Sequence, residues 1–133
     1  MLIAVGIVEY GDRVLVRRRL PGAPYAGSWE FPMTPVEFGD TIEHSTESWV
    51  FESAGLRAHS GALEPAFCCE KMPGYRFFPV KMHTESPRIL STGQNLYKWL
   101  KINDLQKIKM SPPSVMYVKQ IKKISFLIKN VCF

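Results

Sequence analysis

The sequence predicts one α+β domain, an α/β/α sandwich in which a mixed β-sheet lies between two main helices. Two observations lead to this fold class. Short segments with alternating apolar residues, bounded by Gly and Pro, occupy most of the chain before residue 101. Two longer segments, 41–54 and 113–128, carry apolar residues at helical spacing instead. We expect a single domain over residues 1–133, because no linker or repeat interrupts the chain.

The first strands are predicted as a hairpin. Leu2 to Tyr10 and Val14 to Arg19 are β-rich and alternate, and Gly11-Asp12 supplies the turn between them. A Pro- and Gly-rich loop follows over residues 20–28, and Trp29 to Pro32 forms a short apolar strand. We expect the hairpin and this strand to be the first strands of the sheet.

The segment 41–54 is predicted as the first helix. Asp40 or Thr41 can cap its N-terminus, and Gly55 suits the left-handed position just beyond its end. A continuous stripe at helical spacing indicates the face that packs on the sheet, formed by Ile42, Thr46, Trp49, Ser53 and Leu56.

The second half of the chain predicts more strands and the last helix. Pro79 indicates an edge strand or a bulge, because proline cannot donate a ladder hydrogen bond. The expected elements are a strand 56–63, a hairpin of 66–72 and 75–82, a mobile polar loop 83–94, a strand 97–101, a helical turn 103–109 and a helix 113–128.

The formal net charge of +5 favours anionic ligands, such as a nucleotide or a phosphorylated small molecule. It is also compatible with weak attraction to nucleic acid, and a solvated basic surface would explain it equally well. The apolar run Leu2 to Val8 is too short for a membrane span and lacks a signal-peptide cleavage pattern. We therefore expect a cytoplasmic protein with no membrane partner. The sequence does not indicate an oligomeric state.

Residues 27–56 resemble the Nudix box, whose pattern is GX5EX7REUXEEXGU with U a bulky aliphatic residue. Gly55-Leu56 fill its closing pair, Val50 fills its first aliphatic position, and Asp40 stands for its first glutamate. The sequence WEFP at Trp29 to Pro32 is typical of the MutT-like branch, and the opening strands LIAVGIV and VLVRRR are similar to those of that branch. The resemblance covers nearly the whole chain and implies the Nudix fold.

This box departs from the family pattern where the chemistry would lie. Thr34 replaces the opening Gly, Ser48-Trp49 replace the Arg-Glu pair, and Glu52-Ser53 replace the Glu-Glu pair. Carboxylates three and four residues apart on a helix converge on one patch, which suits the hard oxygen ligands that Mg²⁺ prefers. Of the helix glutamates that hold metal in the family, only Glu52 remains. The resemblance therefore leaves Glu52 and Asp40 as remnants of a catalytic and metal-binding site for Mg²⁺ or Mn²⁺.

The resemblance also implies positions for nucleotide contacts. Arg19 falls where a family arginine holds the nucleotide, although a solubilising charge cluster would explain it too. Ser114 falls where an asparagine of MutT-like members reads the purine edge. Phe31 and Phe78 could stack on a base or pack in the core. The family usually supplies another carboxylate from the loop before the 97–101 strand, and no acid occurs here from Ser86 to Asn103.

Three functions follow as alternatives. The first is a MutT-like Nudix domain that binds a nucleotide or phosphorylated metabolite with weak or absent catalysis. The second is an active Mg²⁺-dependent hydrolase of a nucleoside diphosphate, triphosphate or related pyrophosphate. The third is a non-catalytic module that interacts with nucleic acid or protein through its basic last helix.

Overall fold

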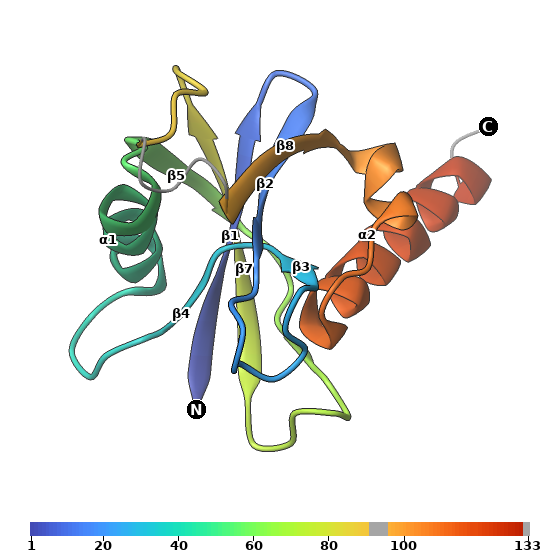
Figure 1. Cartoon of the computed structure of the whole chain (residues 1–133). Helices are drawn as coiled ribbons and strands as arrows, with labels where there is room; N and C mark the ends of the chain where they lie inside the picture. The colour runs from blue at the N-terminus through green and yellow to red at the C-terminus, as the bar shows by residue number, and fades with distance from the viewer. Residues whose placement is uncertain (91–95, 132–133) are drawn as a thin grey trace.

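A computed structural model gives the fold and describes residues 1–90 and 96–131. Within this range a sheet of eight strands lies between helices α1 (Ile42–Ala54) and α2 (Pro112–Val131), which cover opposite faces (Figure 1). A 3₁₀ helix, η2 (Ile102–Lys107), leads from the last strand toward α2. The predicted α/β/α sandwich is confirmed, as are both predicted helices. In the same range, neither helix has the length and apolar character that a membrane crossing needs.

The sheet is organised around the first strand. β1 (Leu2–Tyr10) runs parallel to β7 (Arg76–Thr84) along its whole length, which makes the sheet mixed. The other edge of β1 is shared, because β2 (Arg13–Arg18) pairs with its end and β4 (Met33–Pro35) with its beginning. The remaining strands extend these pairs: β3 (Trp29–Glu30) and β8 (Tyr97–Lys101) on β2, and β5 (Ala58–Leu63) and β6 (Phe67–Cys68) on β7.

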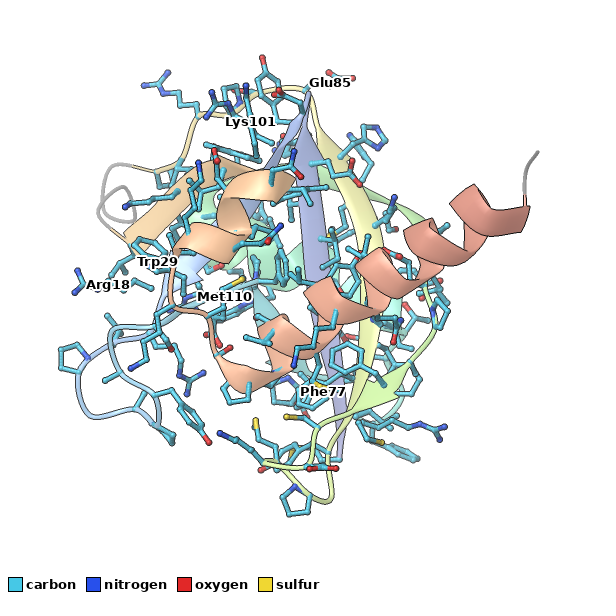
Figure 2. The ribbon with its side chains drawn as sticks, turned by 90° about the vertical axis from the view of Figure 1, so that its right-hand side faces the viewer. Arg18, Trp29, Phe77, Glu85, Lys101 and Met110 are labelled. Atoms are coloured by element: carbon cyan, nitrogen blue, oxygen red, sulfur yellow. The ribbon has the colours of Figure 1, made fainter. Side chains whose placement is uncertain are left out.

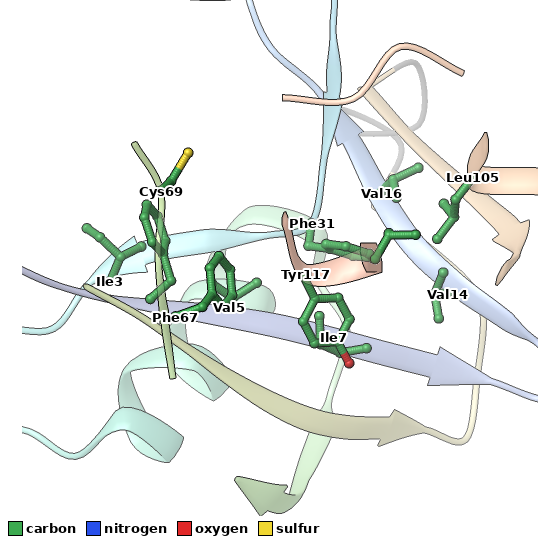
Figure 3. Close-up of a cluster of buried hydrophobic side chains, with 12 residues drawn as sticks. Ile3, Val5, Ile7, Val14, Val16, Phe31, Phe67, Cys69, Leu105 and Tyr117 are labelled. Carbon is green, nitrogen blue, oxygen red and sulfur yellow. The ribbon is translucent and has the colours of Figure 1, made fainter. Parts of the chain in front are cut away.

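Strand alternation produces two apolar cores, one on each face of the sheet. On the side of α2, Val5 and Ile7 pack with Phe31 and with Tyr117 of α2 (Figure 3). On the side of α1, Val8 packs with Val50 and with other buried residues of the helix and sheet. The helices are therefore held by separate cores, and the sheet between them positions their ends.

The ends of α1 agree with the sequence. The Thr41 hydroxyl accepts a hydrogen bond from the backbone N–H of His44 at 3.0 Å, and Gly55 has a φ of 72° in the left-handed region. The predicted packing stripe needs correction. The face of α1 that packs on the sheet is centred on the fully buried Val50 and Ala54, and not on the predicted stripe. Trp49, which belongs to that stripe, is only partly buried. The prediction that Trp49 packs on the sheet is confirmed by its contact with Arg17 of β2.

Later elements agree with the sequence in kind and differ in detail. The hairpin of β6 and β7, the strand β8 and the helical turn η2 are confirmed. Pro79 does not mark an edge, because β7 lies between β1 and β5; the irregularity falls instead in β5, between Ser60 and Leu63. The strand β4 was not predicted. Of the predicted mobile loop 83–94, residues 83–84 end β7, and residues 91–95 lie outside the described residues.

Candidate functional site

The surface between α1 and β2 contains Trp49, and Ser53 lies one turn further along α1. The resemblance assigns both positions to metal-binding glutamates. The Arg17 guanidinium lies over the Trp49 ring, with its carbon 5.6 Å from the ring centroid. The same guanidinium lies 5.9 Å from the ring centroid of Tyr97 in β8. Ser53 donates its hydroxyl hydrogen to the Trp49 carbonyl oxygen at 2.6 Å, and Glu52 is exposed. An arginine and two aromatic rings therefore occupy this surface.

Alternation along β2 places Arg17 there. Val14 and Val16 belong to the core under α2, whereas Leu15 belongs to the core under α1, so Arg17 points toward α1. The Nε of Arg17 and the Nε1 of Trp49 are buried, and neither has a hydrogen-bond partner among the described residues. Two adjacent N–H donors are thus left without an acceptor, which is uncommon in folded proteins.

The Asp40 carboxylate is fully engaged in hydrogen bonds just before α1 begins. One carboxylate oxygen lies 2.8 Å from Nδ1 of His44 and 2.8 Å from the backbone nitrogen of Thr41, and the other accepts from Ser45 at 3.0 Å. The hydrogen bond with His44, and then that from Thr41, lowers the pKa of the Asp40 carboxyl. Its carboxylate is therefore engaged beside the capping residue Thr41, where the chain enters the helix.

Asp40 and Glu52 lie toward opposite ends of α1. Ten residues of helix rise separate Ile42 from Glu52, or about 15 Å, whereas Mg²⁺ bonds oxygen at about 2 Å. One ion cannot touch both carboxylates, so the two predicted remnants do not form one metal site. Within residues 1–90 and 96–131, no three His, Cys, Asp or Glu side chains are grouped so that they could hold a metal ion.

Arg19 borders a pocket of about 370 Å³, which is lined by Tyr25, Glu30, Lys71, Tyr75, Ser111 and others. Its Nη1 donates to Oε2 of Glu30 at 2.8 Å, and its Nε donates to the carbonyl oxygen of Pro24. Glu30 is 8% exposed, so this ion pair is largely screened from water. Arg19 is fixed in place, and Lys71 adds a second positive charge to the wall.

Backbone pairing brings the beginning of α2 to this pocket. The Trp29 nitrogen donates to the Lys109 carbonyl at 2.8 Å, and the Ser111 nitrogen donates to the Trp29 carbonyl at 2.9 Å. Figure 2 shows Trp29 close to Met110, the residue with which it forms a β-bridge. Residues far apart in sequence therefore build one pocket from the loop 20–28, β3 and the first turn of α2.

The other predicted nucleotide contacts lie in different surroundings. Ser114 is fully buried, and its hydroxyl accepts from the Phe31 backbone nitrogen at 3.2 Å and from the Ser111 hydroxyl at 3.3 Å. Phe31 is 1% exposed and meets Tyr117 edge to face at 5.3 Å. Neither side chain presents a free surface to a base. Phe78 is partly buried in β7, opposite Ala4 of β1, and its proposed contact stays a prediction.

Sequence reasoning missed two cationic residues of these sites. Arg17 was not distinguished from the neighbouring arginines, although alternation from Leu15 would have placed it beneath the first helix. Lys71 gave no signal, because its position depends on how the β6–β7 hairpin folds toward α2. Lys71 also borders a second pocket of about 500 Å³, lined mainly by apolar residues and Lys119 along α2.

Comparison with solved structures identifies the fold. A Nudix hydrolase from M. smegmatis, RenU, superposes with a TM-score of 0.73 over 95% of this chain and 86% of its own, at 14% identity. This chain has the Nudix fold. The ORF135 protein of E. coli has a TM-score of 0.72 at 15% identity, over 93% of this chain and 89% of its own.

A MutT Nudix hydrolase from Burkholderia pseudomallei superposes on the same Nudix fold with a TM-score of 0.69 at 16% identity, over 90% of this chain and 96% of its own. The resemblance drawn from the WEFP sequence and the box is thereby confirmed for the fold. At the level of sequence, no family model and no curated protein matches the chain.

Proposed function

We propose that this Nudix-fold domain binds a nucleotide or another phosphorylated small molecule and hydrolyses it weakly or not at all. The observation that carries the proposal is the packing of Trp49 on Arg17, at a position where the family resemblance expects a metal-binding glutamate. A guanidinium and an indole therefore lie where metal-dependent catalysis of the kind that the resemblance implies would need carboxylates.

The binding half of the proposal is supported by the pocket at Arg19. Arg19 is held by Glu30, and Lys71 and Tyr75 line the same wall. A guanidinium and an ammonium in one concave site suit an anionic ligand, while the aromatic and apolar walls suit a flat ring such as a base. The exposed Tyr25 also borders this pocket, and its ring is available for stacking.

The residues present do not fit the divalent metal that the family resemblance implies. Glu52 is a single exposed carboxylate, Ser53 is engaged with the helix backbone, and Asp40 is hydrogen-bonded to Thr41, His44 and Ser45 at the other end of α1. Mg²⁺ is normally held by carboxylates together with substrate phosphates, and supporting groups orient those ligands. We therefore assign no reaction step to a metal at this site.

The test combines a binding assay with a turnover assay. Purified protein is screened against nucleoside diphosphates and triphosphates for thermal stabilisation, and pyrophosphate release is followed with Mg²⁺ and with Mn²⁺. We expect ligand-dependent stabilisation with negligible release. Arg19→Gln should remove the stabilisation, whereas Arg13→Gln, an exposed change of equal charge at the other end of β2, should not.

Robust release that Glu52→Gln abolishes would overturn the proposal and establish the active hydrolase, with Mg²⁺ or Mn²⁺ as its cofactor. The third function has its own signature. Salt-sensitive binding to DNA or RNA, without nucleotide stabilisation, would favour an interaction module over a nucleotide-binding domain.

A further inference from the structure

We infer that Arg17 binds the phosphate groups of the ligand directly, so that a guanidinium takes the role of a metal ion in this Nudix-fold domain. The inference rests on the proposed function and adds the chemical means of binding. It predicts that binding of a pyrophosphate-containing anion needs no divalent cation.

The first support is the set of unused donors. The Nε of Arg17 and the Nε1 of Trp49 are buried without an acceptor among the described residues, and the two side chains are in contact. A guanidinium offers planar paired donors that match two phosphate oxygens, and the indole N–H can donate to a third acceptor. Arg17 as a whole stays partly exposed, so an anion can approach it from solvent.

The second support is charge. Arg17 lies directly opposite Glu30 in the ladder between β2 and β3, yet the Glu30 carboxylate pairs with Arg19. None of the ion pairs among the described residues includes Arg17. In the part of the chain that the structure describes, the guanidinium lies over the faces of Trp49 and Tyr97, which attract a cation weakly and carry no counter-charge. An anion would supply the missing counter-charge.

The third support is the position of Arg17 relative to the pocket at Arg19. The ladder continues beyond β2, since the Arg19 nitrogen donates to the Ser28 carbonyl at 2.9 Å. Alternation therefore places Arg17 and Arg19 on one side of the strand, with Cα atoms about 7 Å apart. Glu30 is shared by both, because it faces Arg17 and binds Arg19. A nucleotide whose base enters the pocket at Arg19 could therefore extend its phosphates toward Arg17.

The aromatic faces on either side of Arg17 also favour a preorganised anion site. Trp49 and Tyr97 restrict the guanidinium between α1 and β8, so little side-chain freedom is lost when a ligand binds. Replacing metal-binding glutamates with Trp and Ser removes the carboxylates that would repel a phosphate in the absence of metal. The same substitutions that leave a metal without ligands thus make direct binding of an anion favourable.

The experiment is calorimetric titration with inorganic pyrophosphate, GTP and guanosine, each in EDTA and in Mg²⁺. We expect pyrophosphate and GTP to bind in EDTA, and we expect Mg²⁺ to leave their affinities unchanged or lower them. Arg17→Gln should weaken pyrophosphate binding by about tenfold or more, because charge-assisted hydrogen bonds are lost. The control Arg18→Gln makes the same change at the exposed neighbouring residue and should alter the affinity less than about twofold.

Two further variants keep the test sharp if Arg17→Gln unfolds the chain. Arg17→Lys retains the charge without the planar fork, and Trp49→Phe retains an aromatic ring without the N–H donor. Each should weaken pyrophosphate binding while the melting temperature confirms a folded protein. Wild-type affinity in both folded variants would overturn the inference.

The outcomes separate this inference from the proposed function. If GTP binds only when Mg²⁺ is present, or binds Arg17→Gln and Arg18→Gln equally, direct phosphate binding is wrong and nucleotide binding stands. If guanosine binds but pyrophosphate does not, the pocket at Arg19 accepts the base alone and the inference again fails. If none of the three ligands binds in either buffer, both proposals fail.

Discussion

Glu47 of α1 accepts two hydrogen bonds from Ser60 of β5 through one carboxylate oxygen, from the backbone N–H at 2.9 Å and from the hydroxyl at 2.6 Å. The hydroxyl bond first, and then the backbone bond, lowers the pKa of the Glu47 carboxyl. This contact ties the middle of the helix that carries Trp49 to the sheet.

Glu47→Gln should lower the free energy of unfolding at pH 7 by about 1 kcal/mol, because the acceptor remains and only its charge is lost. A carboxyl whose pKa is lower in the folded state stabilises the protein above its unfolded pKa. The difference between wild type and variant should therefore shrink as the pH falls below 4.5 and through the folded pKa. Urea unfolding across this range measures it.

The exposed Glu37, which makes no side-chain hydrogen bond among the described residues, provides the matched control. Glu37→Gln should change the free energy of unfolding by less than about 0.5 kcal/mol at either pH. A Glu47→Gln difference that persists undiminished at pH 3 would contradict the assignment to the ionised carboxylate.

Gly6 sets how closely α1 approaches β1. A Cβ at this position would lie 3.0 Å from the Thr46 methyl carbon, and the Gly6 nitrogen donates to the Pro32 carbonyl at 2.8 Å. Gly6→Ala should therefore cost about 1–2 kcal/mol through overpacking. Thr46→Ser removes the clashing methyl group and should recover part of that loss in the double variant.

A double-mutant cycle in urea measures this coupling. Gly61→Ala is the comparison, because a Cβ there would lie 3.4 Å from its nearest atom, the Lys81 carbonyl oxygen, at ordinary contact distance. Additive losses for Gly6→Ala and Thr46→Ser would show that the methyl group is not what requires glycine.

Trp49→Ala should lower the free energy of unfolding by about 2 kcal/mol. A fully buried tryptophan costs about 3 kcal/mol or more when truncated, and this one is partly exposed and packs on one arginine. Phe51→Ala removes an aromatic ring that is 48% exposed on the same helix and should cost well under 1 kcal/mol. Equal losses in the two variants would place Trp49 with the surface residues.

The sequence predicted the individual helices and strands better than the pairing between distant strands. The capping residues Thr41 and Gly55 and the alternation of Tyr97 to Lys101 depend on local chemistry, and they were correct. The strand β4 was missed because Met33–Pro35 has two prolines beside it or within it and pairs only through the distant β1. Pro79 was assigned to an edge or a bulge, because its central place in the sheet depends on parallel pairing with β1, which the local sequence does not show.

The candidate site likewise combines features that the sequence predicted with features that depend on tertiary contacts. Arg19 was recognised from its place at the end of a strand, and the structure gives it a pocket and a partner in Glu30. Phe31 and Ser114 follow directly after Glu30 and Pro113, which line that pocket. Their own side chains are buried, however, where Phe31 packs in the core and Ser114 accepts a hydrogen bond. A residue's position in a motif does not reveal which neighbour has already taken its hydrogen bond.

Introducing the residues of the Nudix box pattern tests whether Arg17 opposes metal-dependent hydrolysis. The substitutions Thr34→Gly, Ser48→Arg, Trp49→Glu and Ser53→Glu return the family residues. In this structure a glutamate at position 49 would meet the Arg17 guanidinium, and an ion pair would occupy the carboxylate that a metal needs. We therefore expect little Mg²⁺-dependent hydrolysis from the fourfold variant.

Adding Arg17→Gln to the fourfold variant should release that carboxylate. Pyrophosphate release from GTP should then rise by about tenfold over the fourfold variant, the size of effect that groups around a metal site usually have. Glu52→Gln in the fivefold background is the control and should return the rate to its lower value, because it removes the native glutamate that completes the set of carboxylates at positions 49, 52 and 53. Equal rates with and without Arg17 would show that this arginine does not compete with the metal.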